Sequence, residues 1–192
     1  KLIREIAKGY PEAIACDIMF VEWADQADNA SVVNAVIEAG NLVSPFLFSE
    51  TADAASQPPP QAMGLTINPR LAPGSARHAT GVLVGPIEDL MEHSAGLGFV
   101  NLSPDADGVI RRVPVVVEMS GALVPSFFLQ ALAIQLDYDL ENISVVDRSH
   151  IILRDFPAGS SGPPRDLPLP LDEDGNLIVN FSGPLSLKNY PH

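Results

Sequence analysis

The chain has 192 residues, of which 46% are apolar, so it can bury a sizeable core, and one domain spanning residues 1–192 is the simplest organisation. Its formal net charge of -13 argues against nucleic acid or an anionic lipid surface as a partner, because both are bound mainly through lysine and arginine. No apolar run reaches the ~18 residues expected of a membrane span. The single cysteine, Cys16, excludes an internal disulfide, and we interpret it as a small apolar group inside a strand.

The N-terminal residues predict a short helix followed by a buried strand. Apolar side chains recur at helical spacing over residues 1–8, and Gly9 offers a C-terminal stop. Residues 13–21 form a nearly continuous apolar run, which is typical of a strand covered on both faces. Only Asp17 interrupts this run, so its carboxylate is expected in a costly apolar environment.

A second helix and a second strand complete a βαβ unit. Asn29 or Ser31 can cap a helix with valine and isoleucine at helical spacing, and Gly40 ends it. Residues 41–48 then predict another buried strand. Strand, helix and strand at this spacing place the domain in the α/β class, with a right-handed crossover.

The next region, residues 51–81, is rich in proline and shows no sustained period, which indicates a long surface excursion within the domain. Long loops in compact domains are often functional, so the excursion is one candidate signal-receiving surface, and a disordered insertion is the alternative. Further along the chain we expect helices at residues 86–94 and 125–136, strands at 143–146, 150–153 and 177–181, and a second loop at 159–170.

The stretch at residues 98–118, GFVNLSPDADGVIRRVPVVVE, organises the middle of the chain. Two β-rich segments flank a break that contains Pro104, Asp105, Asp107 and Gly108, all of which favour turns. This pattern predicts a hairpin or a strand–turn–strand unit. The expected fold is therefore a mixed sheet built on a βαβ unit plus a central β-hairpin, with helices packed on the sheet.

Two adjacent arginines follow that turn. Neighbouring strand residues face opposite ways, so Arg111 shares the more apolar face with valines, whereas Arg112 faces the other side. A guanidinium on an apolar face needs a carboxylate, and the candidates are Asp17 in the first strand and Asp105 or Asp107 in the turn. We favour Asp17, since its own surroundings are apolar. The arginines are then architectural, and a site for an anionic ligand is the alternative.

No catalytic constellation is visible. The histidines lack metal-ligand spacing, and neither a nucleophile elbow nor a phosphate loop occurs. Asp105 and Asp107 are weak candidates for calcium, because Pro114 occupies the position of the bidentate glutamate of an EF-hand loop, and we expect no metal and no cofactor. Trp23 and Glu22, near the end of the first strand, are weak ligand-binding candidates, and partly buried packing is the alternative for Trp23.

The order of several motifs is more specific than any one of them. From Gly98 the chain reads G-F-V-N-x-x-P-D-x-D-G-V-x-R-R-V-P, and Pro125-Ser126 with an apolar helix follows. Asp17 within its apolar run and the segment from Asp174 to Pro184 add to the pattern. Together these residues resemble the CHASE2 family of extracytoplasmic sensor domains. The resemblance is poor over residues 51–81.

The resemblance implies an extracytoplasmic (periplasmic or cell-surface) signal-input domain of a transmembrane receptor, with membrane spans on both sides. Among the outputs of the family we expect a cytoplasmic class III adenylate or guanylate cyclase. We also expect an unidentified small-molecule or environmental stimulus and a homodimer in the full-length receptor. The missing initiator Met also leads us to expect a piece of a longer protein. The alternatives are a periplasmic module that binds a small ligand or cation without signalling, and an α/β hydrolytic enzyme.

Overall fold

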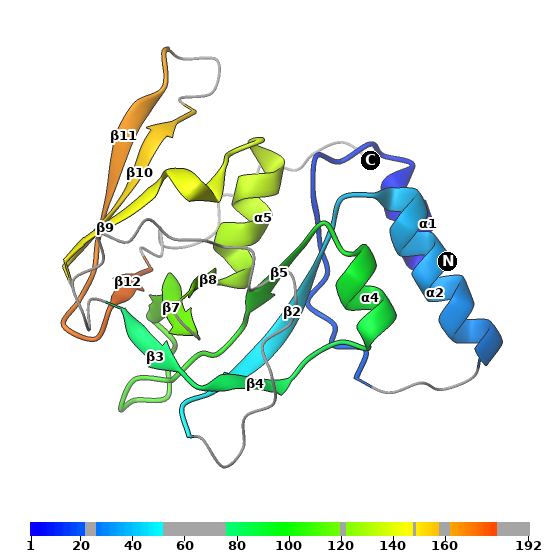
Figure 1. Ribbon diagram of the computed structural model, residues 1–192, viewed down its shortest axis with the longest axis horizontal. Coiled ribbons are helices and arrows are strands. Elements are labelled where there is room, and N and C mark those ends of the chain that lie inside the picture. Colours follow the sequence, from blue (N-terminus) through cyan, green and yellow to red (C-terminus); the bar gives the residue numbers. More distant parts are fainter. Residues whose placement is uncertain (22–25, 52–75, 120–121, 148, 158–161, 180–192) are drawn as a thin grey trace.

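The computed structural model describes residues 1–21, 26–51, 76–119, 122–147, 149–157 and 162–179 (Figure 1). The helices are α1 (Leu2–Ala7), α2 (Gln26–Ala39), α4 (Glu88–His93), α5 (Phe127–Gln135) and the 3-10 helix η2 (Leu140–Asn142). The strands are β1 (Ile14–Ala15), β2 (Leu42–Ser49), β3 (Arg77–Ala79), β4 (Gly81–Val84), β5 (Gly96–Phe99), β6 (Arg112–Pro114), β7 (Val116–Met119), β8 (Ala122–Pro125), β9 (Ile143–Asp147), β10 (His150–Phe156), β11 (Arg165–Pro170) and β12 (Asn176–Ile178). Parallel and antiparallel pairs both occur, so the predicted α/β class is confirmed.

The βαβ unit is confirmed, and its second strand is the centre of the main sheet. Strands β1 and β2 are parallel, with Ile14 opposite Leu42, and α2 connects them. Helix α2 ends where Gly40 takes a φ of +70 and its N–H donates to the Val36 carbonyl oxygen at 2.9 Å. The first half of β2 also pairs in parallel with β5, and its last residues pair antiparallel with β4. This double pairing explains why almost every residue of β2 is buried.

Helices cover the main sheet from two sides (Figure 1). Helix α5 packs on β5, β2 and β1, while α4, α2 and α1 lie across the sheet from it. Helix α5 confirms the helix predicted at residues 125–136, and its Leu129 and Ala133 are 1% and 5% exposed. A separate apolar cluster joins α1, α2 and α4 to β1 and β2 through Ile3, Ile14, Ala35, Val36, Leu42 and Leu90.

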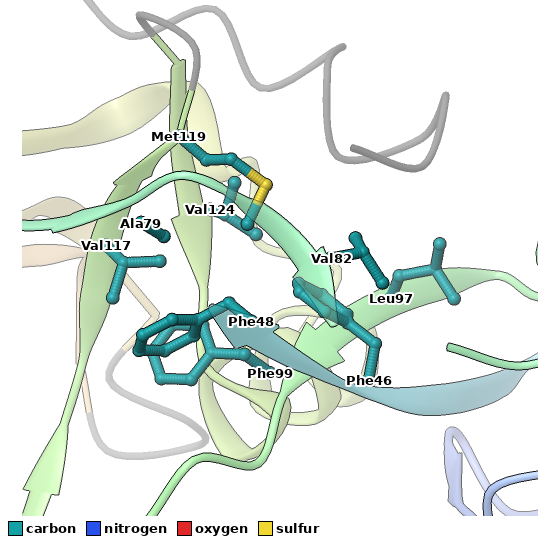
Figure 2. Packing of buried hydrophobic residues seen from close by; sticks show 9 residues of the cluster. All are labelled: Phe46, Phe48, Ala79, Val82, Leu97, Phe99, Val117, Met119 and Val124. Atoms are coloured by element: carbon teal, nitrogen blue, oxygen red, sulfur yellow. The ribbon is translucent and has the colours of Figure 1, made fainter. Parts of the chain in front are cut away.

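Figure 2 shows the apolar cluster where the main sheet meets the β3–β7–β8 sheet. Phe48 of β2 and Phe99 of β5 pack edge to face, with ring centroids 5.2 Å apart and an interplanar angle of 83°. The cluster is formed by Phe46, Phe48, Ala79, Val82, Leu97, Phe99, Val117, Met119 and Val124. Because these side chains come from six strands of the two sheets, their burial holds the two sheets together.

The two strands that flank the central turn do not pair with each other. Strand β5 pairs with β2, β6 pairs with β12, and β7 pairs with β3 and β8. The connection at residues 100–111 is much longer than the roughly 2–5 residues of a hairpin loop, and both strands have other partners. Of the two predicted alternatives, the structure therefore contains the strand–turn–strand unit. The hairpin of this region is formed one strand later, by β7 and β8.

Two predicted loops contain strands. The end of the expected excursion at residues 51–81 forms β3 and the start of β4, while residues 52–75 lie outside the described part of the chain. Within the expected loop at residues 159–170, β11 pairs antiparallel with β10 at the edge of its sheet. An edge strand tolerates Pro168 and Pro170, since the missing N–H groups are not needed there, and Leu167 and Leu169 pack on the core.

Candidate functional site

The acidic turn between β5 and β6 is built by its own backbone. The Asp105 N–H donates to the Val109 carbonyl oxygen at 2.9 Å, and the Gly108 N–H donates to the Asp105 carbonyl oxygen at 2.8 Å. The Asp107 side chain accepts from the Val109 N–H at 3.1 Å, so it caps the turn. Gly108 has a φ of +82, a backbone conformation that residues other than glycine rarely adopt, which explains its place in the motif.

Both arginines bind this turn. The Arg111 guanidinium contacts Asp107 twice, at 2.9 Å from Nη1 to Oδ1 and 2.8 Å from Nη2 to Oδ2, and reaches Asp105 at 3.2 Å. Arg112 pairs with Asp105 through Nη1 and with Asp172 through Nε, the latter at 3.1 Å. Asp105 therefore receives two guanidinium groups. Arg112 ties the central turn to the turn that precedes β12, next to the pairing of β6 with β12.

The predicted pair between Arg111 and Asp17 is wrong. Strand β1 contains only Ile14 and Ala15, and the chain has left the sheet before Asp17, whose side chain is exposed. An exposed carboxylate needs no cation, so the large cost expected for a broken buried pair does not apply here. Cys16, predicted inside the strand, is half-buried just after it, and burial raises the pKa of its thiol.

The ion pairs shift the protonation equilibria of their members. The hydrogen bond from Arg111, followed by that from the Val109 N–H, holds the pKa of Asp107 below its ordinary value. Burial raises the pKa of Asp172, but hydrogen bonds from Asn176 and from the Asp174 N–H, together with Arg112, more than offset it and leave that pKa lowered. The pKa values of Arg111 and Arg112 are raised, mainly by their hydrogen bonds to Asp107 and Asp105 respectively. Asp107, Asp172 and both arginines are therefore ionised near neutral pH.

A cavity of about 750 Å³ lies beside this cluster. It is bounded by β3, the central turn, β6 and the turn before β12. Its lining residues are Ala76, Arg77, His78, Ser103, Pro104, Asp105, Arg112, Pro114, Glu173, Asp174, Gly175 and Asn176. Its volume falls in the range of roughly 300–1,000 Å³ that is usual for small-molecule sites, and its lining is unusually rich in charge. The arrangement can hold a small, charged solute.

The sequence identified part of this cavity. Asp105 and Arg112 belong to the central motif, and Asp174 begins the C-terminal segment that contributes to the family resemblance. Arg77 and His78 were missed, because they were assigned to the proline-rich excursion. The β-branched and apolar residues at 79–84 were the available sign that a strand begins near Arg77.

The sequence also suggested a ligand-binding pair and two calcium ligands. Trp23 and Glu22 lie outside the described residues. Asp105 and Asp107, the alternative calcium ligands, are engaged by Arg111 and Arg112. Among the residues that the structure describes, no group of three or more His, Cys, Asp or Glu side chains is placed to hold a metal ion. No helix within the described ranges is long and apolar enough to cross a membrane.

The model of the CHASE2 domain family matches residues 1–192, which is the whole chain. The chain belongs to the CHASE2 family. CHASE2 domains are extracellular sensory modules rather than catalytic ones, which agrees with the prediction that this chain has no enzymatic activity of its own. Searches of curated proteins and of solved structures returned no match. In this CHASE2 domain, the motif residues from Pro104 to Pro114 include the acidic turn and both arginines, and four of them line the cavity.

Proposed function

We propose that this CHASE2 domain is the signal-input part of a transmembrane receptor whose cytoplasmic output is a class III adenylate or guanylate cyclase. The observation that carries the sensory role is the match of an extracellular sensory family over the whole chain. The cyclase follows from the outputs that the resemblance implies, and membrane spans on both sides of the domain follow from the same resemblance. The receptor then passes a signal from outside the membrane to an enzyme inside it.

The test uses the full-length parent protein in membranes. Formation of cyclic AMP from ATP, or of cyclic GMP from GTP, should depend on the parent and should change when residues 1–192 are replaced by an unrelated soluble domain. The isolated 192-residue chain should turn over neither nucleotide. A parent that forms no cyclic nucleotide would contradict the cyclase output, and nucleotide turnover by the isolated chain would contradict a purely sensory domain.

A binding module without a signalling output is the second candidate, because the cavity beside Arg112 is compatible with ligand binding in either role. The two differ in what ligand binding does. A receptor changes its output when the site is filled, whereas a simple binding module has no output to change. The sequence on either side of the domain separates them as well, because membrane spans on both sides are expected only of a receptor.

We also propose that the domain works as a homodimer through α1. Ile3 of this helix is buried against α2, and Arg4 binds Glu38 of α2 at 2.6 Å, but Leu2 and Ile6 remain 66% and 43% exposed. A six-residue helix is not stable alone, so α1 depends on such contacts. The charge of -13 on each copy opposes association at low salt. Sedimentation at high protein concentration should show weak dimers that strengthen with ionic strength, and Leu2→Ser/Ile6→Ser should abolish them.

A further inference from the structure

The cavity beside Arg112 has opposite charges on two of its walls. Strand β3 contributes Arg77 and His78 to one wall, and the turn before β12 contributes Glu173 and Asp174 to another. These walls belong to different sheets, since β3 pairs with β7 and β12 pairs with β6. A ligand that fits between them meets a basic group on one side and carboxylates on the other.

Not all charges of the cavity are equally available to a ligand. Asp105 and Arg112 are engaged with each other, and Asp172, next to the cavity, is engaged with Arg112 as well. Glu173 and Asp174 are exposed, and their side chains make no ion pair with any residue that the structure describes. The acidic wall is therefore available to a cationic group, whereas Asp105 and Arg112 line the cavity as an ion pair.

The basic wall is held in position by its neighbours. Arg77 pairs with Glu50 of the loop after β2 through Nε, and its guanidinium carbon lies 5.9 Å from the centre of the Phe48 ring. A guanidinium carries five N–H donors, so one pairing leaves donors for a carboxylate. His78 is exposed beside it. Arg77 is thus a pre-positioned anion-binding group, which lowers the entropic cost of binding.

We propose that this cavity binds a zwitterionic solute of the amino acid or short-peptide class. The carboxylate lies at Arg77 and His78, and the ammonium group lies at Glu173 and Asp174. The volume of about 750 Å³ accommodates a free amino acid or a short peptide. A plain anion would leave the acidic wall without a partner, and a plain cation would not use the guanidinium N–H donors of Arg77 that remain beside its pairing with Glu50. The role of this ligand as the stimulus of the receptor rests on the sensory function proposed above. Ligand binding itself is a property of this domain alone.

The first experiment asks whether both charged ends of the solute are needed. The 192-residue chain is titrated calorimetrically with each proteinogenic L-amino acid and, in a separate arm, with dialanine and trialanine, which distinguishes free amino acids from peptides. Each ligand that binds is compared with its N-acetyl form, which lacks the ammonium, and with its amide, which lacks the carboxylate. We expect at least one zwitterion to bind and both blocked forms to bind at least about tenfold more weakly, because each loses a charge-assisted hydrogen bond.

The second experiment locates the site with matched variants. Glu173→Gln/Asp174→Asn removes two negative charges from the cavity wall, and Asp89→Asn/Glu92→Gln removes two from exposed positions of α4, which does not line the cavity. The wall variant should lose at least about tenfold in affinity, and the α4 variant should bind like the wild type. Arg77→Gln should weaken binding similarly, with its folding checked by circular dichroism.

Several outcomes would overturn the proposal: no zwitterion binds, a blocked form binds as well as its parent, or the wall and α4 variants bind alike. The sensory function is judged separately, from cyclic nucleotide formation by the full-length protein in membranes. If the zwitterion binds but never changes that output, the binding site stands and the receptor role fails. If the output depends on the domain while no zwitterion binds, the receptor role stands and the proposed ligand class is wrong.

Discussion

Gly98 lies where β5 comes closest to the start of α5, and replacing it with alanine should destabilise the domain strongly. A Cβ at this position would lie 2.4 Å from the Phe127 Cα, 2.6 Å from the Phe127 nitrogen and 2.9 Å from the Ser126 carbonyl carbon. All three are backbone atoms, so no side chain can turn aside. Ordinary contacts begin at 3.4 Å, so α5 and β5 must separate by about 1 Å.

The cost follows from what that separation disturbs. Helix α5 packs on β5 and carries Leu129 and Ala133 into the core, so moving it opens contacts along the whole helix. Overpacking of this kind costs about 1–3 kcal/mol, and a clash with backbone belongs at the upper end. At roughly 2–4 °C per kcal/mol for a chain of this size, the thermal midpoint should fall by about 6–12 °C. Thermal unfolding followed by circular dichroism measures this shift.

Gly96 provides the matched control, since it lies two residues away on the same face of β5. The three heavy atoms nearest to a Cβ there all belong to the Gln130 side chain, with Nε2 at 2.3 Å, and a flexible side chain can move. Neither glycine has a positive φ, so backbone strain does not separate the two substitutions. Gly96→Ala should cost much less than Gly98→Ala, and adding Gln130→Ala should remove most of the remaining cost. Equal midpoints for Gly96→Ala and Gly98→Ala would refute the reasoning.

Three further predictions concern the core and two ionisable groups. Leu129→Ala should lower the unfolding free energy by about 2–5 kcal/mol in urea titrations, because Leu129 is 1% exposed, while Phe128→Ala at a 38% exposed position should cost clearly less. Since the folded-state pKa of Asp172 is lowered from 3.8, its stabilising contribution is present above that pH and is lost as the pH falls below it. The urea midpoint of Asp172→Asn should therefore depend less on pH in this acidic window than that of the wild type. An unchanged pH dependence would contradict the assignment. Burial and then the charges of Asp155, Asp139 and Asp166 raise the pKa of Tyr138 from 10.0 to about 12, so the wild type should lose stability as the pH rises through that interval. Tyr138→Phe should not show this loss. The variant also lacks the hydrogen bond from the Tyr138 hydroxyl to the Arg154 carbonyl oxygen.

The elements that follow a local pattern were predictable, and those that depend on distant pairing were not. The apolar character of α5 on all sides, the buried run of β2 and the stop at Gly40 each follow from nearby residues. By contrast, β11 contains prolines that normally indicate a loop, and only its place at the edge of a sheet makes them tolerable. The need for glycine at position 98 has the same origin, because it arises from α5, which comes later in the chain.

The site shows the same limit at the level of single side chains. Strand alternation was applied to Arg111 and Arg112 as if both lay in one strand, but β6 begins at Arg112, so the rule does not place Arg111. Both guanidinium groups then reach Asp105, because the turn from Asp105 to Gly108 folds back toward the start of β6. The prediction of Asp17 as the partner of Arg111 depends on a buried strand over residues 13–21. Ile18 and Val21 in that run are 51% and 48% exposed, so the run is not such a strand. The ionic contacts of a turn are therefore better predicted from its own carboxylates and the nearest basic residues than from distant apolar runs. By that rule Asp105 and Asp107 would have been chosen, and the acidic turn at residues 172–175 would have been the next place to look for a partner of Arg112.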